Sequence, residues 1–253
     1  MHWPYRPHGA GPAGRVTPGQ INTVPPMSDT MTLHVVTVFL GDGDTGGNPL
    51  GVFLEAPPLE EGARQAIAAD LGFPETVFVT DPLRGELHIH APALELPLAG
   101  HPLVGTSWLL RGTGREVDTL HTLAGPVPTW VEEGLTWIRA DPEWAPEFES
   151  SQLPSPQDVD ALAGGRPGTD LHVWAWEDEA AGQVRVRVFP DEMGIAEDEA
   201  TGSAALRLGA HLHRPLTIRQ GVGSRIDVRP HPDGTVAVGG RCAVLETREY
   251  PLP

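Results

Sequence analysis

Lysine is absent from the 253-residue sequence, and all 17 of its basic residues are arginine. A Schiff base between a lysine amine and a carbonyl substrate is therefore excluded, and with it the internal aldimine of pyridoxal phosphate enzymes. A Walker A phosphate loop is excluded as well, because that motif needs a Gly-Lys pair. Other side chains have to carry the chemistry of this chain.

Cysteine is almost as scarce, since Cys242 is the only one. One thiol forms no internal disulfide, which is typical of a reducing compartment, and we expect a cytoplasmic protein. Mechanisms that need two thiols are excluded. Apolar runs are short too: none approaches the roughly 20 residues that span a membrane, and the first residues lack the layout of a secretory signal.

The formal charge of −17 limits the partners of the chain. Such a surface repels nucleic acid and anionic membranes, so neither is expected to bind. An anionic substrate would need a local positive region, which the N-terminus of a helix supplies without a basic side chain.

Proline and glycine crowd the first residues, and we predict a disordered extension over 1–30. The alternative is an upstream start codon, with the folded part beginning at Met27 or Met31. An N-terminal half is expected over 31–140 and a C-terminal half over 141–253, with the last strand able to return to the N-terminal half. The stretch 141–168 is rich in proline, glycine and acid, and is predicted to be a linker or an excursion between the halves.

Hydrophobic periodicity predicts many strands and few, well-buried helices, which indicates an α+β protein. The predicted helices cover 59–71, ended by Gly72, and two buried segments at 103–110 and 202–213. The predicted strands cover 33–40, 50–54, 75–79, 86–90, 130–138, 171–176, 184–189, 225–228 and 235–238.

Two segments repeat the order strand, loop and buried helix, and their equivalent residues Ala99 and Ala200 lie 101 positions apart. A single repeat of this kind indicates two pseudo-symmetric halves with a ligand between them. Pro102 is predicted at the first position of one helix. The N–H groups of two converging helix starts would hold a carboxylate. In the simpler alternative, Thr201 and Ser203 only cap a helix.

Two carboxylates are candidates for acid–base work. Glu75 shares a strand face with Val77 and Val79, so it should point inward, where desolvation raises a carboxyl pKa toward neutrality. The alternative is a partly exposed residue at a strand end. Asp198 precedes the second buried helix and is suited to orient the substrate or carry the partner proton; alternatively it only favours the helix N-terminus.

Metal chemistry has weaker support. His88 and His90 share one strand face, and with His101 they offer three imidazoles to a metal. No HExxH or carboxylate facial pattern accompanies them, so no metal site is assigned. Asp42 and Asp44 lie in a glycine-rich loop that lacks the glutamate of a calcium site.

These motifs together resemble the PhzF-like (phenazine biosynthesis-like) family, which has the diaminopimelate epimerase fold. The resemblance runs from about Leu33 to Arg248. It rests on Thr37-Val-Phe39, Gly47-Asn-Pro-Leu50, Pro74-Glu-Thr-Val-Phe78, Ala99-Gly-His-Pro102, Val188-Phe-Pro190, Glu197-Asp-Glu-Ala-Thr-Gly-Ser-Ala204 and Arg219-Gln-Gly221.

The resemblance implies two halves, each a β-barrel-like sheet wrapped around a central helix, with the site between them. It implies a proton-shuttling glutamate at Glu75, assisted by His101 and Asp198. The residues expected to bind substrate are Gly100, Gly202, Ser203, Thr201 and Asn48. Family members commonly work as homodimers without a cofactor. The related epimerases use paired cysteines, which this chain lacks.

Three departures from the family pattern stand out: Glu199 replaces a usual proline, the stretch between the halves is short, and the N-terminal extension has no counterpart. We expect a cofactor-independent isomerase or epimerase that moves a proton on a small carboxylate-bearing molecule. The alternatives are a non-catalytic metabolite-binding protein with the same fold and, from the histidines, a metal-dependent enzyme.

Overall fold

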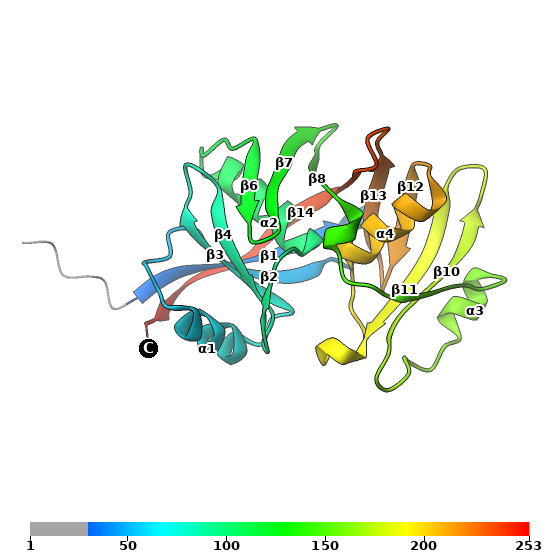
Figure 1. Cartoon of the computed structure of the whole chain (residues 1–253), viewed down its shortest axis with the longest axis horizontal. Coiled ribbons are helices and arrows are strands. Elements are labelled where there is room, and N and C mark those ends of the chain that lie inside the picture. The colour runs from blue at the N-terminus through cyan, green and yellow to red at the C-terminus, as the bar shows by residue number, and fades with distance from the viewer. Residues whose placement is uncertain (1–29, 253) are drawn as a thin grey trace, which may run out of the picture.

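The computed structural model describes residues 30–252. The extension predicted over residues 1–30 therefore lies outside the described residues, except for Thr30. Two strand-rich halves lie side by side, and each has a helix at its centre (Figure 1). The helices are α1 (Glu61–Leu71), α2 (Gly100–Gly112), α3 (Pro156–Asp160) and α4 (Gly202–Leu212), with 3₁₀ turns η1 (Asp42–Asp44), η2 (Pro142–Trp144) and η3 (Asp191–Met193).

The strands divide between the halves, with β1 to β8 before residue 141 and β9 to β13 after it, while β14 belongs to both. They are β1 (Thr30–Leu40), β2 (Asn48–Phe53), β3 (Glu75–Asp81), β4 (Glu86–His90), β5 (Glu95–Leu96), β6 (Thr119–Thr122), β7 (Gly125–Glu132), β8 (Leu135–Ala140), β9 (Glu149–Gln152), β10 (Asp170–Asp178), β11 (Gln183–Pro190), β12 (Leu216–Gln220), β13 (Ser224–Pro230) and β14 (Val236–Pro251).

The N-terminal half is a closed barrel around α2. Its strands are hydrogen-bonded in the order β1-β2-β3-β4-β6-β7-β8-β14, and β14 pairs again with β1 to close the ring. Because the barrel surrounds it, α2 is buried along 10 of its 13 residues. The buried helix predicted here is confirmed, but it begins at Gly100, so Pro102 is its third residue rather than its first.

The C-terminal half is a sheet in the order β14-β13-β12-β11-β10-β9, which curves around α4 and ends at β9. Apolar residues of α4, among them Leu206 and Leu208, are buried in the same core as Val228 and Val238 of the sheet. The short helix α3 covers the outer face, where Val159 packs with Phe189. The predicted α+β fold, two similar halves with a central helix each, is confirmed.

The strand β14 belongs to both halves. Its first residues, Val236–Gly240, pair with β8, and the first four of them also pair with β13. From Arg241 to Pro251 it pairs with β1 in the barrel. In Figure 1 it runs as a red ribbon from the C-terminal half into the N-terminal one. The sequence pattern predicts a strand at 235–238 and a last strand able to return to the N-terminal half, and the structure joins the two in one continuous strand, β14.

Two sequence predictions need correction. The strand expected over 130–138 is a hairpin, because Glu133 and Gly134 both have positive φ and form the turn between β7 and β8. The stretch 141–168 is more than a linker, since it contains η2, α3 and β9, and β9 pairs in parallel with β10. Among residues 30–252 no helix is long and apolar enough to cross a membrane.

Candidate active site

Glu75 stands at the first position of β3 and is directed into the barrel. It shares a strand face with Val77 and Val79, which both belong to the core around α2. Its side chain is only 13 % exposed, and its Oε2 lies 3.1 Å from Nε2 of His101 near the start of α2. The prediction that Glu75 points inward is therefore met.

The contact between Glu75 and His101 is close, but it lacks the alignment of a hydrogen bond. Among the described residues, neither Glu75 Oε2 nor His101 Nε2 has a hydrogen-bond partner, although both atoms are buried. Buried polar atoms without partners are rare, because each loses its water and gains nothing in return. Glu75 Oε2 and His101 Nε2 are two such atoms, and they face each other.

Asp198 reaches the same region from the C-terminal half. The segment before α4 is extended here: the Asp198 N–H donates to the Val188 carbonyl over 3.0 Å. Its Oδ1 accepts a 2.7 Å hydrogen bond from Asn48 Nδ2, and its Oδ2 accepts a 2.6 Å bond from the Thr201 hydroxyl. Asn48 begins β2 of the barrel, so the Asn48–Asp198 bond joins the two halves.

Gln220 completes this network, and its role was not predicted from the sequence. Its Nε2 donates to the Asp198 carbonyl and to Thr201 Oγ1, both over 2.8 Å, and its Oε1 accepts from the Thr201 N–H over 3.1 Å. The signal was present in the Arg219-Gln-Gly221 motif, but nothing in the local pattern says which side chain of that strand faces Asp198.

The starts of α2 and α4 meet at two glycines. A β-carbon on Gly100 would lie 2.7 Å from Cα of Gly202, and one on Gly202 would lie 2.8 Å from Cα of Gly100. No side chain caps either helix. Ala99 has no polar side chain, and the Thr201 hydroxyl donates its hydrogen bond to Asp198 instead. The interpretation of Thr201 as a helix cap is therefore wrong. Ser203, the second residue of α4, is partly exposed beside these N–H groups.

Burial dominates the protonation equilibria of the site. It raises the pKa of Glu75 well above its ordinary value, and the charge of Asp198 raises it further. Burial also raises the pKa of Asp198, against hydrogen bonds from Thr201, Asn48 and the backbone that lower it. Burial lowers the pKa of His101 to about 3, which a hydrogen bond to the Pro49 backbone partly offsets. At neutral pH His101 is a neutral imidazole.

His88 and His90 do not join this site. His88 Nδ1 lies 2.6 Å from Glu95 Oε1, and His90 contacts Arg64 and Gln65 of α1. His101 instead faces Glu75 inside the barrel. Within residues 30–252, no cluster of three or more metal-binding side chains is present. The three imidazoles considered for a metal are thus divided between two surroundings.

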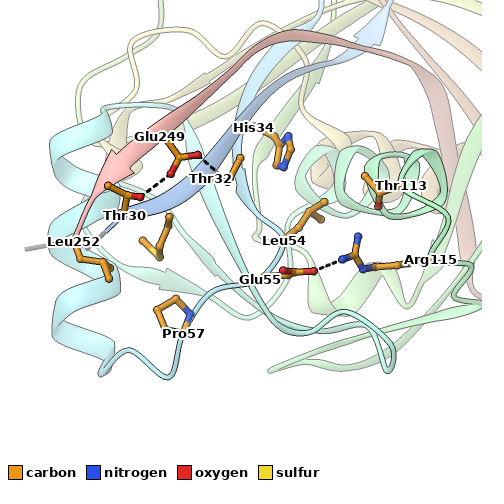
Figure 2. A pocket seen from close by; sticks show the side chains of 11 residues that line it. Thr30, Thr32, His34, Leu54, Glu55, Pro57, Thr113, Arg115, Glu249 and Leu252 are labelled. Atoms are coloured by element: carbon orange, nitrogen blue, oxygen red, sulfur yellow. Dashed lines mark hydrogen bonds and ion pairs between the residues drawn. The ribbon is translucent and has the colours of Figure 1, made fainter. Parts of the chain in front are cut away.

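A cavity of about 610 Å³ lies elsewhere, beside the beginning of β1 and the end of β14 (Figure 2). Glu249 bonds to Thr30 and Thr32 there, and Glu55 pairs with Arg115. Thr113, directly after the last residue of α2, also lines it. A helix of 13 residues is roughly 20 Å long, so this cavity lies far from His101 at the other end of α2.

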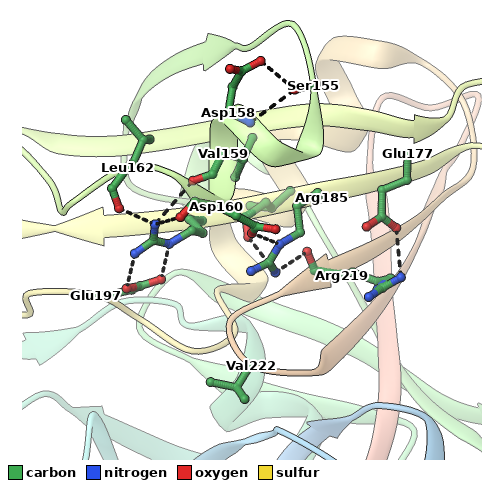
Figure 3. Close-up of polar contacts among 12 residues, drawn as sticks. Ser155, Asp158, Val159, Asp160, Leu162, Glu177, Arg185, Glu197, Arg219 and Val222 are labelled. Atoms are coloured by element: carbon green, nitrogen blue, oxygen red, sulfur yellow. Dashed lines mark hydrogen bonds and ion pairs between the residues drawn. The ribbon is translucent and has the colours of Figure 1, made fainter.

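The segment that carries Asp198 is anchored from the outer face of the sheet. Arg187 of β11 binds Glu197 through Nε and Nη2, both over 2.7 Å, and donates Nη1 to the Leu162 carbonyl. Figure 3 shows this cluster, with Asp160 and Arg185 beside it. Because neighbouring residues of an extended segment point to opposite sides, fixing Glu197 outward directs Asp198 inward.

Comparison with known proteins identifies the family of this chain. Residues 38–167 match the family model described as phenazine biosynthesis-like protein (PhzC-PhzF). The chain is 31 % identical over 230 residues to a trans-2,3-dihydro-3-hydroxyanthranilate isomerase of Pseudomonas fluorescens, a match that covers 70 % of this chain and 81 % of the relative. The chain belongs to the phenazine biosynthesis-like family. Because several relatives are named isomerases, it is also an isomerase, as predicted.

Solved structures confirm the fold of this family member. A PhzF-family phenazine biosynthesis protein from Bacillus anthracis superposes with a TM-score of 0.70 at 21 % identity, covering 87 % of this chain and 99 % of that chain. A predicted epimerase from Pseudomonas aeruginosa superposes with a TM-score of 0.63 at 25 % identity, covering 87 % and 99 % respectively.

Proposed function

We propose that this protein is a cofactor-independent isomerase that moves a proton on a small carboxylate-bearing substrate, with Glu75 as the group that carries the proton. The observation that supports this most is the pair of buried, unpartnered atoms, Glu75 Oε2 and His101 Nε2, 3.1 Å apart. A substrate between the two halves would be the partner that both atoms lack.

The raised pKa of Glu75 suits a group that takes a proton from a substrate and returns it. A carboxylate with an ordinary pKa is a weak base at neutral pH, whereas desolvation and the charge of Asp198 make Glu75 a stronger one. It takes a proton from a substrate carbon, and the electron pair of the broken C–H bond moves into the adjacent conjugated system. Glu75 then returns the proton to another carbon or to the opposite face, so that no oxidant or reductant is needed.

His101 acts as a neutral group. The Nδ2 of Asn48 has two hydrogens, and its two short contacts, to Asp198 Oδ1 at 2.7 Å and to the Ala200 carbonyl at 3.1 Å, use both. Asn48 Nδ2 therefore has no hydrogen left to donate to His101 Nδ1 across the 3.5 Å contact between them. His101 carries its own hydrogen on Nδ1, and its Nε2 lone pair faces Glu75 and accepts a hydrogen bond from protonated Glu75 or from the substrate.

Asp198 and the N–H groups at the starts of α2 and α4 orient and bind the polar groups of the substrate. Asp198 is held by Asn48 and Thr201, and it orients a polar group while keeping Glu75 basic. The uncapped N–H groups at Gly202 and Ser203, together with the start of α2, bind the carboxylate and stabilise developing charge. This arrangement reconciles an anionic substrate with a chain of net charge −17.

The first substrate to test is trans-2,3-dihydro-3-hydroxyanthranilate, the compound in the names of the Pseudomonas relatives. Incubated with it in deuterated water, the wild-type protein should convert it and incorporate deuterium, followed by NMR. Glu75→Gln should abolish both signals, while the exposed Glu86→Gln on β4 retains them. Full turnover in Glu75→Gln would refute the assignment.

The homodimer implied by the family resemblance stays a prediction, which light scattering checks.

A further inference from the structure

Glu199 fills the turn between β12 and β13 with its carboxylate. Its Oε1 accepts hydrogen bonds from the Val222 N–H at 2.8 Å and from the Ser224 hydroxyl at 3.0 Å. Gly221 has φ of +57° and lies so close that a β-carbon there would sit 2.2 Å from the Glu199 carboxyl carbon. The turn is therefore built around this one side chain.

The same turn touches the N-terminal half. Ser224 is fully buried, and its Oγ accepts a 2.7 Å hydrogen bond from the Gly47 N–H. Backbone lies directly on backbone here, since a β-carbon on Gly46 would be 2.4 Å from the Ser224 nitrogen. Asn48, the next residue after Gly47, is the one that reaches across to Asp198.

These contacts close into a ring, because Asp198 and Glu199 are consecutive and so are Gly47 and Asn48. We propose that Glu199 is a positioning residue, whose carboxylate holds Ser224 against Gly47 so that Asn48 is placed on Asp198. The expected effect on catalysis rests on the function proposed above, whereas the hold of Glu199 on Ser224 and Gly47 does not depend on it. Glu199 touches no reacting atom and works through Ser224 and Asn48.

Glu197 offers a matched control on the same segment. Its carboxylate also makes two hydrogen bonds, but they go to Arg187 on the outer face, away from Gly47. Figure 3 shows Glu197 in this cluster and Val222 of the turn apart from it. Loss of Glu197 loosens the segment without touching Ser224, so the two acids separate a general effect from the proposed one.

The first test needs no substrate. Amide hydrogen exchange of Gly47 and the side-chain NH₂ signals of Asn48 are followed by NMR in the full-length protein. Glu199→Ala and Ser224→Ala should each accelerate Gly47 exchange about tenfold or more, as expected when one hydrogen bond of roughly 1.4 kcal/mol is lost. Glu199→Gln should preserve the wild-type rate, because its amide oxygen accepts the same two bonds. Unchanged Gly47 exchange in Glu199→Ala, or equal acceleration in Glu197→Ala, overturns the proposal.

The second test measures kcat and KM with trans-2,3-dihydro-3-hydroxyanthranilate. Glu199→Ala should lower kcat by about 10- to 100-fold with little change in KM, because misplaced catalytic groups cost rate at this scale. Glu199→Gln should restore kcat. Accelerated Gly47 exchange with unchanged kcat would overturn the positioning role. If the wild type itself turns over nothing, the proposed function fails, while the exchange data still decide whether Glu199 holds Gly47.

Discussion

Gly100 and Gly202 pack backbone against backbone, and a β-carbon on Gly100 would lie 2.7 Å from Cα of Gly202. The two central helices of the protein thus begin at a single point of contact. Neither residue has positive φ, so glycine is required here for space rather than for backbone conformation.

This contact predicts a specific sensitivity at Gly100. Gly100→Ala should push the two helix starts apart, lower the free energy of unfolding by about 1–3 kcal/mol and remove activity, because overpacking at buried backbone is destabilising. Chemical denaturation and the deuterium assay measure both effects. Gly112→Ala is the control, since a β-carbon at that end of α2 meets nothing within 4 Å. Equal behaviour of the two variants would contradict the tight contact.

A second prediction concerns the stability cost of Glu75. Its pKa is higher in the folded than in the unfolded chain, so its protonated form favours folding and that contribution is lost as pH rises through the folded pKa. Glu75→Gln removes the buried charge and should therefore raise Tm at pH 7–8, by about 2–4 °C per kcal/mol gained. The gain should shrink toward pH 4, where Glu75 is protonated in both states. Calorimetry across pH checks this, and a lower Tm at pH 8 would contradict it.

A third prediction lies away from the site, at His172 on β10. This side chain is 3 % exposed, its Nδ1 lies 2.9 Å from Ser150 Oγ, and burial lowers its pKa to about 4. Between about pH 6.5 and 4, His172 is therefore protonated in the unfolded chain and neutral in the folded chain. Stability should fall over this window as pH drops, with His172 contributing at most about 3 kcal/mol.

Urea denaturation from pH 7 to 4 measures that loss. His172→Gln should flatten the pH dependence, because its amide does not titrate. His121→Gln, at an exposed position on β6, is the control and should keep the wild-type slope. A slope that His172→Gln leaves unchanged would assign the acid sensitivity to other groups, His90 and His101 first, whose pKa values burial also lowers.

Local pattern was enough for the elements that carry the site. The inward direction of Glu75 follows from the two-residue period of a strand, and the end of α1 at Gly72 follows from its left-handed backbone. The two buried helices follow from apolar residues around their circumference. These features depend on residues within one turn or one strand of each other, which is the range that a sequence pattern reports.

Contacts between distant segments could not be predicted from the sequence. The hydrogen bonds that Gln220 donates to Thr201 and that Gly47 donates to Ser224 join residues 19 and 177 positions apart. Whether such side chains meet depends on how the two halves pack, and no periodicity encodes that. Glu199 was noted only as a departure from the family pattern, and its partners Val222 and Ser224 became visible through the fold.

The shared strand β14 also sets an order on assembly of the chain. The barrel closes only when residues 241–251 pair with β1, which is the first strand of the described chain. During synthesis one edge of β1 therefore stays unpaired and exposed until residues 241–251 have left the ribosome. The barrel that holds Glu75 is therefore completed only after the segment that carries Asp198 has been synthesised.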